Sequence, residues 1–71
     1  MYHMNGNKIN YFLREAGFNQ TKLARIIGAP RPNVTEVIAG RRHTRWIQEA
    51  IARAINMKIE DVFPDGKGKK A

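Results

Sequence analysis

The sequence predicts an all-α fold, a compact domain of five short helices, on three observations. Apolar residues recur at the spacing of helical turns, without the sustained alternation that is typical of strands. Asn, Thr, Gly and Pro residues separate these apolar runs, at the places where helices start and stop. A chain of 71 residues has room for one domain only, because a shorter unit could not enclose a second core.

The first two helices follow from apolar spacing and from their end residues. One helical face carries residues spaced i, i+3, i+4 and i+7, namely Ile9, Phe12, Leu13 and Ala16. Gly17 can end this helix in a left-handed conformation. Asn19 can cap a second helix over about 20–27, and Gly28 follows it as a stop.

Two prolines place the third helix. Because a residue before proline is driven toward extended geometry, Ala29 and Arg31 are expected outside a helix. Pro32 suits the first position of a helix, so we expect Arg31 as the cap and a helix over 32–39, after a turn of about four residues. Gly40 ends it. The apolar side of this helix consists of Val34, Val37 and Ile38.

The last two helices follow a basic loop. Thr44 can cap a fourth helix, whose apolar stripe is the longest in the chain: Ile47, Ala50, Ile51, Ala54 and Ile55. A short fifth helix contains Ile59, Val62 and Phe63, and Pro64 closes it. Trp46 stands beside the stripe, where it either shields the edge of the core or forms a dimer surface with Ile59 or Met57.

Composition limits the environment and the partners of the chain. Thirteen Lys and Arg against six Asp and Glu give a net charge of +7, and such a field attracts polyanions, nucleic acid first. Residues 31–45 hold four Arg and one Glu, whereas 46–64 are close to neutral. The chain has no cysteine and no apolar run long enough for a membrane, so we expect a cytoplasmic protein that either is marginally stable or gains stability by self-association.

Segments at the two ends differ from the middle in composition. We expect a flexible N-terminus over 1–6, a folded domain over 7–64 and a disordered basic tail over 65–71. Either Asn5 or Asn7 can cap the first helix. His3 and His43 are isolated, so no metal site is predicted, and no cofactor or small-molecule ligand is evident. Known catalytic motifs are absent as well, and an enzyme is not expected.

Residues 8–64 resemble the Cro and repressor class of helix-turn-helix proteins, the lambdoid-phage-like, XRE-type regulators. Counted from Gln20, that pattern asks for a small residue four positions on, a glycine eight on and five apolar residues at set positions. The chain supplies Ala24, Gly28, Leu23, Ile27, Ala29, Val34 and Val37. The resemblance implies a compact, lambda-repressor-like domain and a DNA-binding regulator of transcription, with no catalytic role.

In this class the second helix of the unit enters the major groove with its N-terminal residues facing base edges. The resemblance therefore implies these base-reading residues: Arg31, Pro32, Asn33, Thr35 and Glu36. The expected phosphate-binding residues are Gln20, which matches the family's phosphate-binding glutamine, with Lys22, Arg41, Arg42 and Arg45. The partner implied is a double-stranded, palindromic DNA operator bound by a homodimer.

Several roles stay open at the level of the sequence. Arg31 can bond guanine O6 and N7 together, or it can lie solvated beside a phosphate. Glu36 can accept from cytosine N4, act as a repulsive filter, or pair with a nearby Arg. Arg41 and Arg42 can bind phosphates, or they can simply belong to a solvated loop. At the level of the whole protein, a regulator competes with an antitoxin or restriction-modification controller and with a helical adaptor whose basic surface is incidental.

Overall fold

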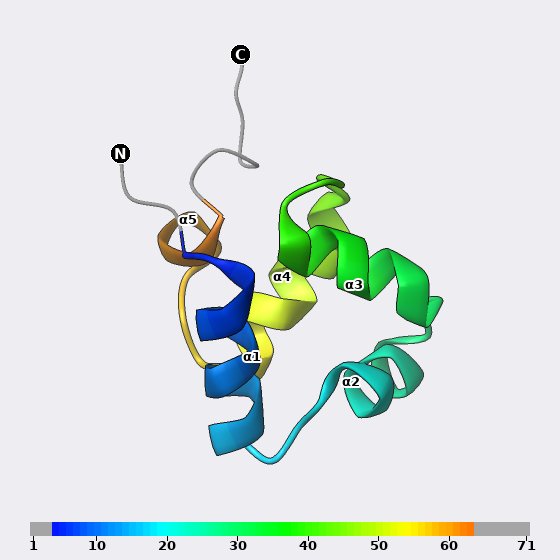
Figure 1. Ribbon diagram of the computed structural model, residues 1–71, viewed down its shortest axis with the longest axis horizontal. Coiled ribbons are helices and arrows are strands. Elements are labelled where there is room, and N and C mark those ends of the chain that lie inside the picture. Colours follow the sequence, from blue (N-terminus) through cyan, green and yellow to red (C-terminus); the bar gives the residue numbers. More distant parts are fainter. Residues whose placement is uncertain (1–3, 64–71) are drawn as a thin grey trace.

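The computed structural model describes residues 4–63, which form five helices and no strand, so the all-α prediction is confirmed (Figure 1). The helices are α1 (Gly6–Glu15), α2 (Gln20–Ile27), α3 (Arg31–Ala39), α4 (Arg45–Ala54) and α5 (Ile59–Val62). The expected tail over 65–71 lies outside the described residues. None of the described helices has the length and hydropathy needed to cross a membrane.

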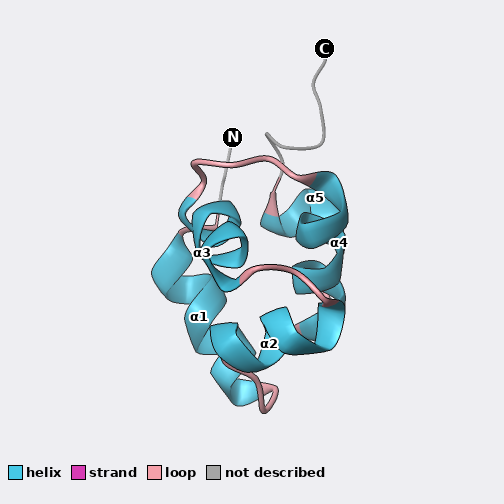
Figure 2. Ribbon diagram, turned by 90° about the vertical axis from the view of Figure 1, so that its right-hand side faces the viewer, coloured by secondary structure: helices cyan, strands magenta, loops and turns pink. Residues whose placement is uncertain are grey.

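The helices enclose one core, with α3 and α4 at its centre. Helix α3 contacts α1, α2 and α4, and α4 also contacts α2 and α5. In Figure 1, α4 passes behind α3, while Figure 2 looks onto α2 and α3 and the short turn that joins them. The largest fully buried side chains come from all five helices and the residue after α5: Ile9, Leu13, Leu23, Val34, Val37, Ile47, Gln48, Ile51, Val62 and Phe63.

The packed part of the chain begins earlier than residue 7. Met4 is 3% exposed and belongs to the core. The side chain of Asn5, one of the two expected caps, accepts a hydrogen bond from the backbone N–H of Lys8 at 2.9 Å. Gly6 starts α1 so close to α3 that a Cβ there would lie 3.3 Å from the carbonyl oxygen of Ile38. Residues 4–6 are therefore tied down, and residues 1–3 lie outside the described part.

The start of α3 corrects one expectation. Pro30, with φ −61° and ψ 137°, is the N-cap, and Arg31 is the first helical residue. The carbonyl of Pro30 accepts from the N–H groups of Asn33 and Val34 at 3.0 and 3.3 Å. First-turn N–H groups have no partner inside a helix, so the missing N–H of Pro32 is tolerated at the second position as well as at the first. The turn between α2 and α3 is accordingly three residues, 28–30, and not four.

Burial differs from the predicted stripes at two places. Ala16, expected on the buried face of the first helix, is exposed because α1 ends at Glu15 and Ala16 forms its C-cap. Ala50 and Ala54 on α4 and Ile55 at its C-cap are only partly buried, whereas Gln48 and Ala52 are almost completely buried. Three helices pack against α4, so its buried face is wider than a single apolar stripe predicts.

The structure leaves the buried amide of Gln48 without a partner. Its side chain is 1% exposed, and neither its oxygen nor its nitrogen makes a hydrogen bond. A polar group desolvated in this way costs about 1–3 kcal/mol of folding free energy. Replacement by an apolar side chain of similar length removes that cost.

We therefore expect Gln48→Leu to raise the free energy of unfolding by about 1–2 kcal/mol. In a domain of this size, that change corresponds to a melting temperature about 4–16 °C higher. Thermal unfolding followed by circular dichroism measures it. A melting temperature equal to or lower than that of the wild type would show that the amide is satisfied in solution.

Candidate nucleic-acid interface

Helix α3 buries one side and presents the other. Val34, Val37 and Ile38 are at most 3% exposed and fix the helix on the core. On the remaining surface, Arg31 and Pro32 are exposed, and Asn33, Thr35 and Glu36 are partly buried. The five residues expected to read bases therefore all retain some access to solvent at the N-terminal part of the helix.

The turn after α2 sets the angle of α3. Gly28 has φ 76°, a left-handed conformation that costs glycine little. Its N–H and that of Ala29 both donate to the carbonyl of Ala24, at 2.9 and 3.0 Å. Ala24 and Ala29 are 4% and 8% exposed, since α2 and α3 cross closely beside them. Small residues and a left-handed glycine at these positions agree with the spacing read from the sequence.

A chain of hydrogen bonds joins three helices through Gln20. Its Nε2 donates to Oδ1 of Asn10 on α1 at 2.9 Å, and its Oε1 accepts from the hydroxyl of Thr35 on α3 at 2.6 Å. Each end of the amide thus makes one bond within the protein and keeps a second position, a hydrogen on Nε2 and a lone pair on Oε1. The expected phosphate-binding glutamine also holds a residue that was expected to read bases.

A surface hollow of about 360 Å³ lies where α1, α2 and α3 meet. It is lined by Asn10, Arg14, Phe18, Asn19, Gln20, Thr21 and Arg31. Asn19 caps α2 by accepting from the N–H of Lys22 at 2.8 Å, so the positive end of that helix opens toward the hollow. The structure thereby brings Arg31 together with Gln20 and with Arg14.

Arg14 is the cation that the sequence analysis missed. It belongs to the last turn of α1, six residues before α2, and nothing in its local sequence distinguishes it from an ordinary solvated arginine. Only the packing of α1 beside the start of α2 brings it to the same hollow as Arg31. Lys22, which the sequence analysis favoured, is exposed, and its Nζ lies 3.4 Å from the carbonyl oxygen of Gly17.

Three predicted phosphate-binding arginines are paired with glutamates. Nε of Arg41 and Nε of Arg42 lie 4.0 and 3.9 Å from the carboxylate of Glu36. Nε of Arg45 donates to Glu49 at 2.9 Å. All of these side chains are at least 43% exposed, and exposed pairs of this kind contribute only about 0–1 kcal/mol. A phosphate can therefore replace the glutamate as partner at low cost.

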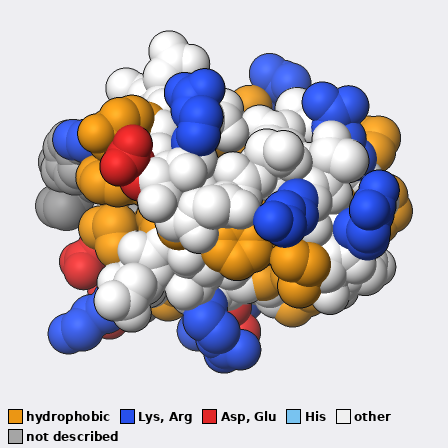
Figure 3. Space-filling view, turned by 90° about the horizontal axis from the view of Figure 1, so that it is seen from below, with side chains coloured by type: hydrophobic (Ala, Val, Ile, Leu, Met, Phe, Trp, Pro, Cys, Tyr) orange, Lys and Arg blue, Asp and Glu red, His pale blue; other side chains and the backbone are white. Residues whose placement is uncertain are grey.

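Charge is unevenly distributed over the molecular surface. Seen from below in Figure 3, Lys and Arg side chains are spread over the face, on its left as well as on its right. The Asp and Glu side chains visible in that view lie toward the left and along the lower rim. The right-hand part of this view therefore carries Lys and Arg side chains without acidic neighbours.

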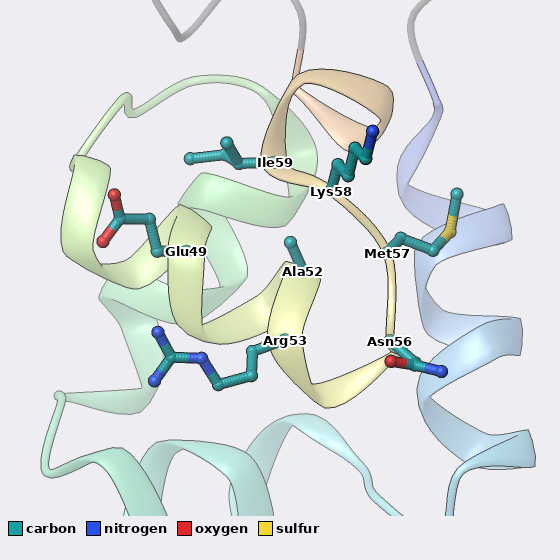
Figure 4. A pocket seen from close by; sticks show the side chains of 7 residues that line it. All are labelled: Glu49, Ala52, Arg53, Asn56, Met57, Lys58 and Ile59. Carbon is teal, nitrogen blue, oxygen red and sulfur yellow. The ribbon is translucent and has the colours of Figure 1, made fainter.

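Two further hollows lie away from α3. One, of about 480 Å³, lies between α4 and the segment that leads into α5 (Figure 4), and it is lined by Glu49, Ala52, Arg53, Asn56, Met57, Lys58 and Ile59. The other, of about 410 Å³, is a mostly apolar groove between α2 and α4. Trp46 is 50% exposed and lines neither hollow, and it is not among the side chains packed on the core.

No cluster of three or more His, Cys, Asp or Glu side chains that could hold a metal occurs within residues 4–63. His43 is exposed, and His3 lies outside the described residues.

Removing the hydroxyl of Thr35 tests the bond chain at the interface. Thr35→Val keeps the shape of the side chain and deletes the donor to Gln20, so we expect a loss of about 0.5–1.5 kcal/mol of stability. The melting temperature should fall by about 2–12 °C. Thr21→Val is the matched control, since Thr21 is exposed on α2. Equal melting temperatures for the two variants would contradict a hydrogen bond of this strength.

Comparison with known proteins agrees with this geometry. A family model described as the Cro/C1-type helix-turn-helix DNA-binding domain matches residues 8–65. No curated protein matches the chain at a significant level. The match extends over most of the chain and includes α2, the 28–30 turn and α3 together with the helices that support them. The chain therefore belongs to the family of Cro/C1-type helix-turn-helix DNA-binding domains.

Proposed function

We propose that this protein is a sequence-specific transcriptional regulator of the phage or prophage repressor type, which reads a DNA operator with α3 in the major groove. The observation that carries the proposal is the one-sided burial of α3. Its apolar side is fixed on the core, and its N-terminal residues remain open to solvent, where Arg31 lines a hollow together with Arg14. A major groove about 12 Å wide accepts a helix presented in this way.

The proposed contacts divide into two sets. Pro32, Asn33 and Glu36 face base edges, and Thr35 adds its methyl group and oxygen, because its proton is already donated to Gln20. Gln20 and Lys22 at the start of α2 bind one phosphate, while Arg41, Arg42 and Arg45 bind others. Arg14 joins the phosphate set, since it lines the hollow at the start of α2.

Arg31 stands between the two sets. Its place at the first position of α3 suits a bidentate bond to guanine, and its place in the hollow with Arg14 suits a phosphate. We assign it to base reading, because it is the one long cation at the N-terminal end of the groove-facing helix.

Dimerisation on DNA follows from the symmetry of such operators, whose half-sites lie about 34 Å apart. A second copy of a chain with charge +7 approaches most easily at a surface with little net charge. Residues 46–64 provide it, with two basic and three acidic side chains, the exposed Trp46 and the hollow beside Met57 and Ile59. We place the dimer contact on this α4–α5 side and the protein in the bacterial cytoplasm.

Selection of bound fragments from a random DNA pool, followed by footprinting, tests the function. A regulator should enrich one sequence and protect a palindrome. If about four phosphates are contacted per subunit, log K should fall against log salt with a slope near −3.6 per subunit. A helical adaptor would enrich no sequence and protect no site. An autoregulating antitoxin would protect its own promoter but would also bind a second protein.

Two single variants separate base reading from phosphate binding. We expect Arg31→Ala to reduce the preference for the selected sequence by about 1–3 kcal/mol while binding remains salt-dependent. Arg14→Ala should weaken binding to selected and random duplexes by the same factor and lower the magnitude of the salt slope by about 0.9. Competition binding at several salt concentrations measures both quantities. An Arg31→Ala protein that keeps its full sequence preference would reassign Arg31 to a phosphate.

A further inference from the structure

Glu36 occupies the centre of the exposed face of α3. It is the only acidic residue in that helix, and Pro32, Glu36 and Ala39 follow one another at i, i+4 and i+7 on the side opposite to the buried valines. Pro32 and Ala39 are exposed, and the side chain of Glu36 is 43% exposed. A carboxylate thus stands in the middle of the face that the proposed function turns toward DNA.

The end of α3 ties two arginines to this carboxylate. Gly40 takes a left-handed conformation with φ 85°, which returns the chain toward the helix. The N–H groups of Arg41 and Arg42 then donate to the backbone carbonyl of Glu36 at 3.0 and 3.3 Å. Their Nε atoms lie 4.0 and 3.9 Å from its carboxylate oxygens. The backbone bonds hold both residues beside the glutamate, and their exposed side chains lie within ion-pair distance of its carboxylate.

Double-stranded DNA offers this carboxylate few partners. Phosphates repel it, and most major-groove groups are acceptors: guanine O6 and N7, adenine N7 and thymine O4. Only the amino groups of cytosine and adenine can donate to it there. On a non-cognate site Glu36 therefore lacks a donor on the DNA, and it also competes with phosphates for Arg41 and Arg42.

We propose that Glu36 is a specificity-determining residue that restrains binding to non-cognate DNA by holding Arg41 and Arg42 until an amino group in the groove takes their place. The inference rests on the proposed function, DNA binding through α3, and goes beyond it. Part of the sequence preference then comes from Glu36, because it weakens binding to non-cognate DNA. Glu36 then has all three roles considered above: it accepts a hydrogen bond from a base amino group, it repels non-cognate DNA, and it pairs with nearby arginines.

Two other glutamates provide matched controls for the change of charge. Glu49 pairs with Arg45 at 2.9 Å but lies on α4, away from the exposed face of α3. Glu60 is exposed on α5, and no ion pair between it and an arginine is found among residues 4–63. Glutamine at each position raises the net charge equally. A general charge effect therefore appears in all three variants, and the effect of Glu36 appears in one.

The experiment measures binding of wild type, Glu36→Gln, Glu49→Gln and Glu60→Gln to a random-sequence duplex by fluorescence anisotropy between about 50 and 200 mM salt. We expect Glu36→Gln to bind this duplex about threefold to tenfold more tightly than the wild type at the lower salt, because each freed arginine can gain a phosphate. Its salt slope should steepen by about 1–2. Glu60→Gln should change little, and Glu49→Gln should steepen the slope by at most about 1.

A second readout is the ratio of affinities for the duplex selected by the wild type and for the random duplex. Glu36→Gln should lower this ratio at least threefold, whereas Glu49→Gln and Glu60→Gln should preserve it. Circular dichroism shows whether all variants are folded. If Glu36→Gln matches Glu60→Gln in affinity, slope and ratio, the inference is overturned while the proposed function stands. A wild type that binds no duplex at any salt overturns the proposed function, and the inference with it.

Discussion

The crossing of α2 and α3 is the constraint on which the interface depends. Ala24 is buried where the two helices meet, and its carbonyl accepts both N–H groups of the turn that follows α2. The left-handed glycine in that turn lets the chain reverse within three residues. Val34 and Val37 on the core-facing side of α3 are fully buried, so this helix has one orientation on the core. Every assignment of a groove-facing residue follows from that orientation.

Hydrogen bonds near this crossing orient the side chains that we propose for DNA binding. Gln20 bonds to α1 and to α3 at once, so its amide has one fixed direction at the start of α2. A fixed donor loses less conformational entropy when it meets a ligand than a free surface side chain does. The same arrangement removes the proton of Thr35 from base reading. Near α2, the Gln20 amide is thus held in place before DNA binds. The Thr35 hydroxyl can only accept a hydrogen bond there.

Ion pairs with acidic residues lower the number of free arginines available for phosphate binding. Glu36 and Glu49 pair with three of the arginines expected to bind phosphates. A surface with free arginines only would bind every DNA sequence tightly, because phosphates carry no sequence information. Placing a carboxylate among the cations lowers that uniform attraction. The near-neutral α4–α5 side is, by contrast, where we propose the contact with a second copy.

The sequence by itself determined the helices and their approximate limits, since apolar spacing, asparagine caps and glycine stops are local signals. It also determined the helix-turn-helix pattern, because small, glycine and apolar residues recur at fixed distances from Gln20. Local rules failed at Arg31, which is the first residue of α3 in spite of the steric bias on a residue before proline. They also failed on α4, which packs against three other helices and buries Gln48 outside the apolar stripe.

Only the tertiary structure decided which charged groups meet. Arg14 reaches the hollow of Arg31 because α1 packs beside the start of α2, and Thr35 reaches Gln20 across 15 residues of chain. Long flexible side chains carry no periodic signal, and their partners depend on the distance between helices that are separate in the sequence. The sequence therefore determined the framework of the interface, and the packing of the helices decided its polar contacts.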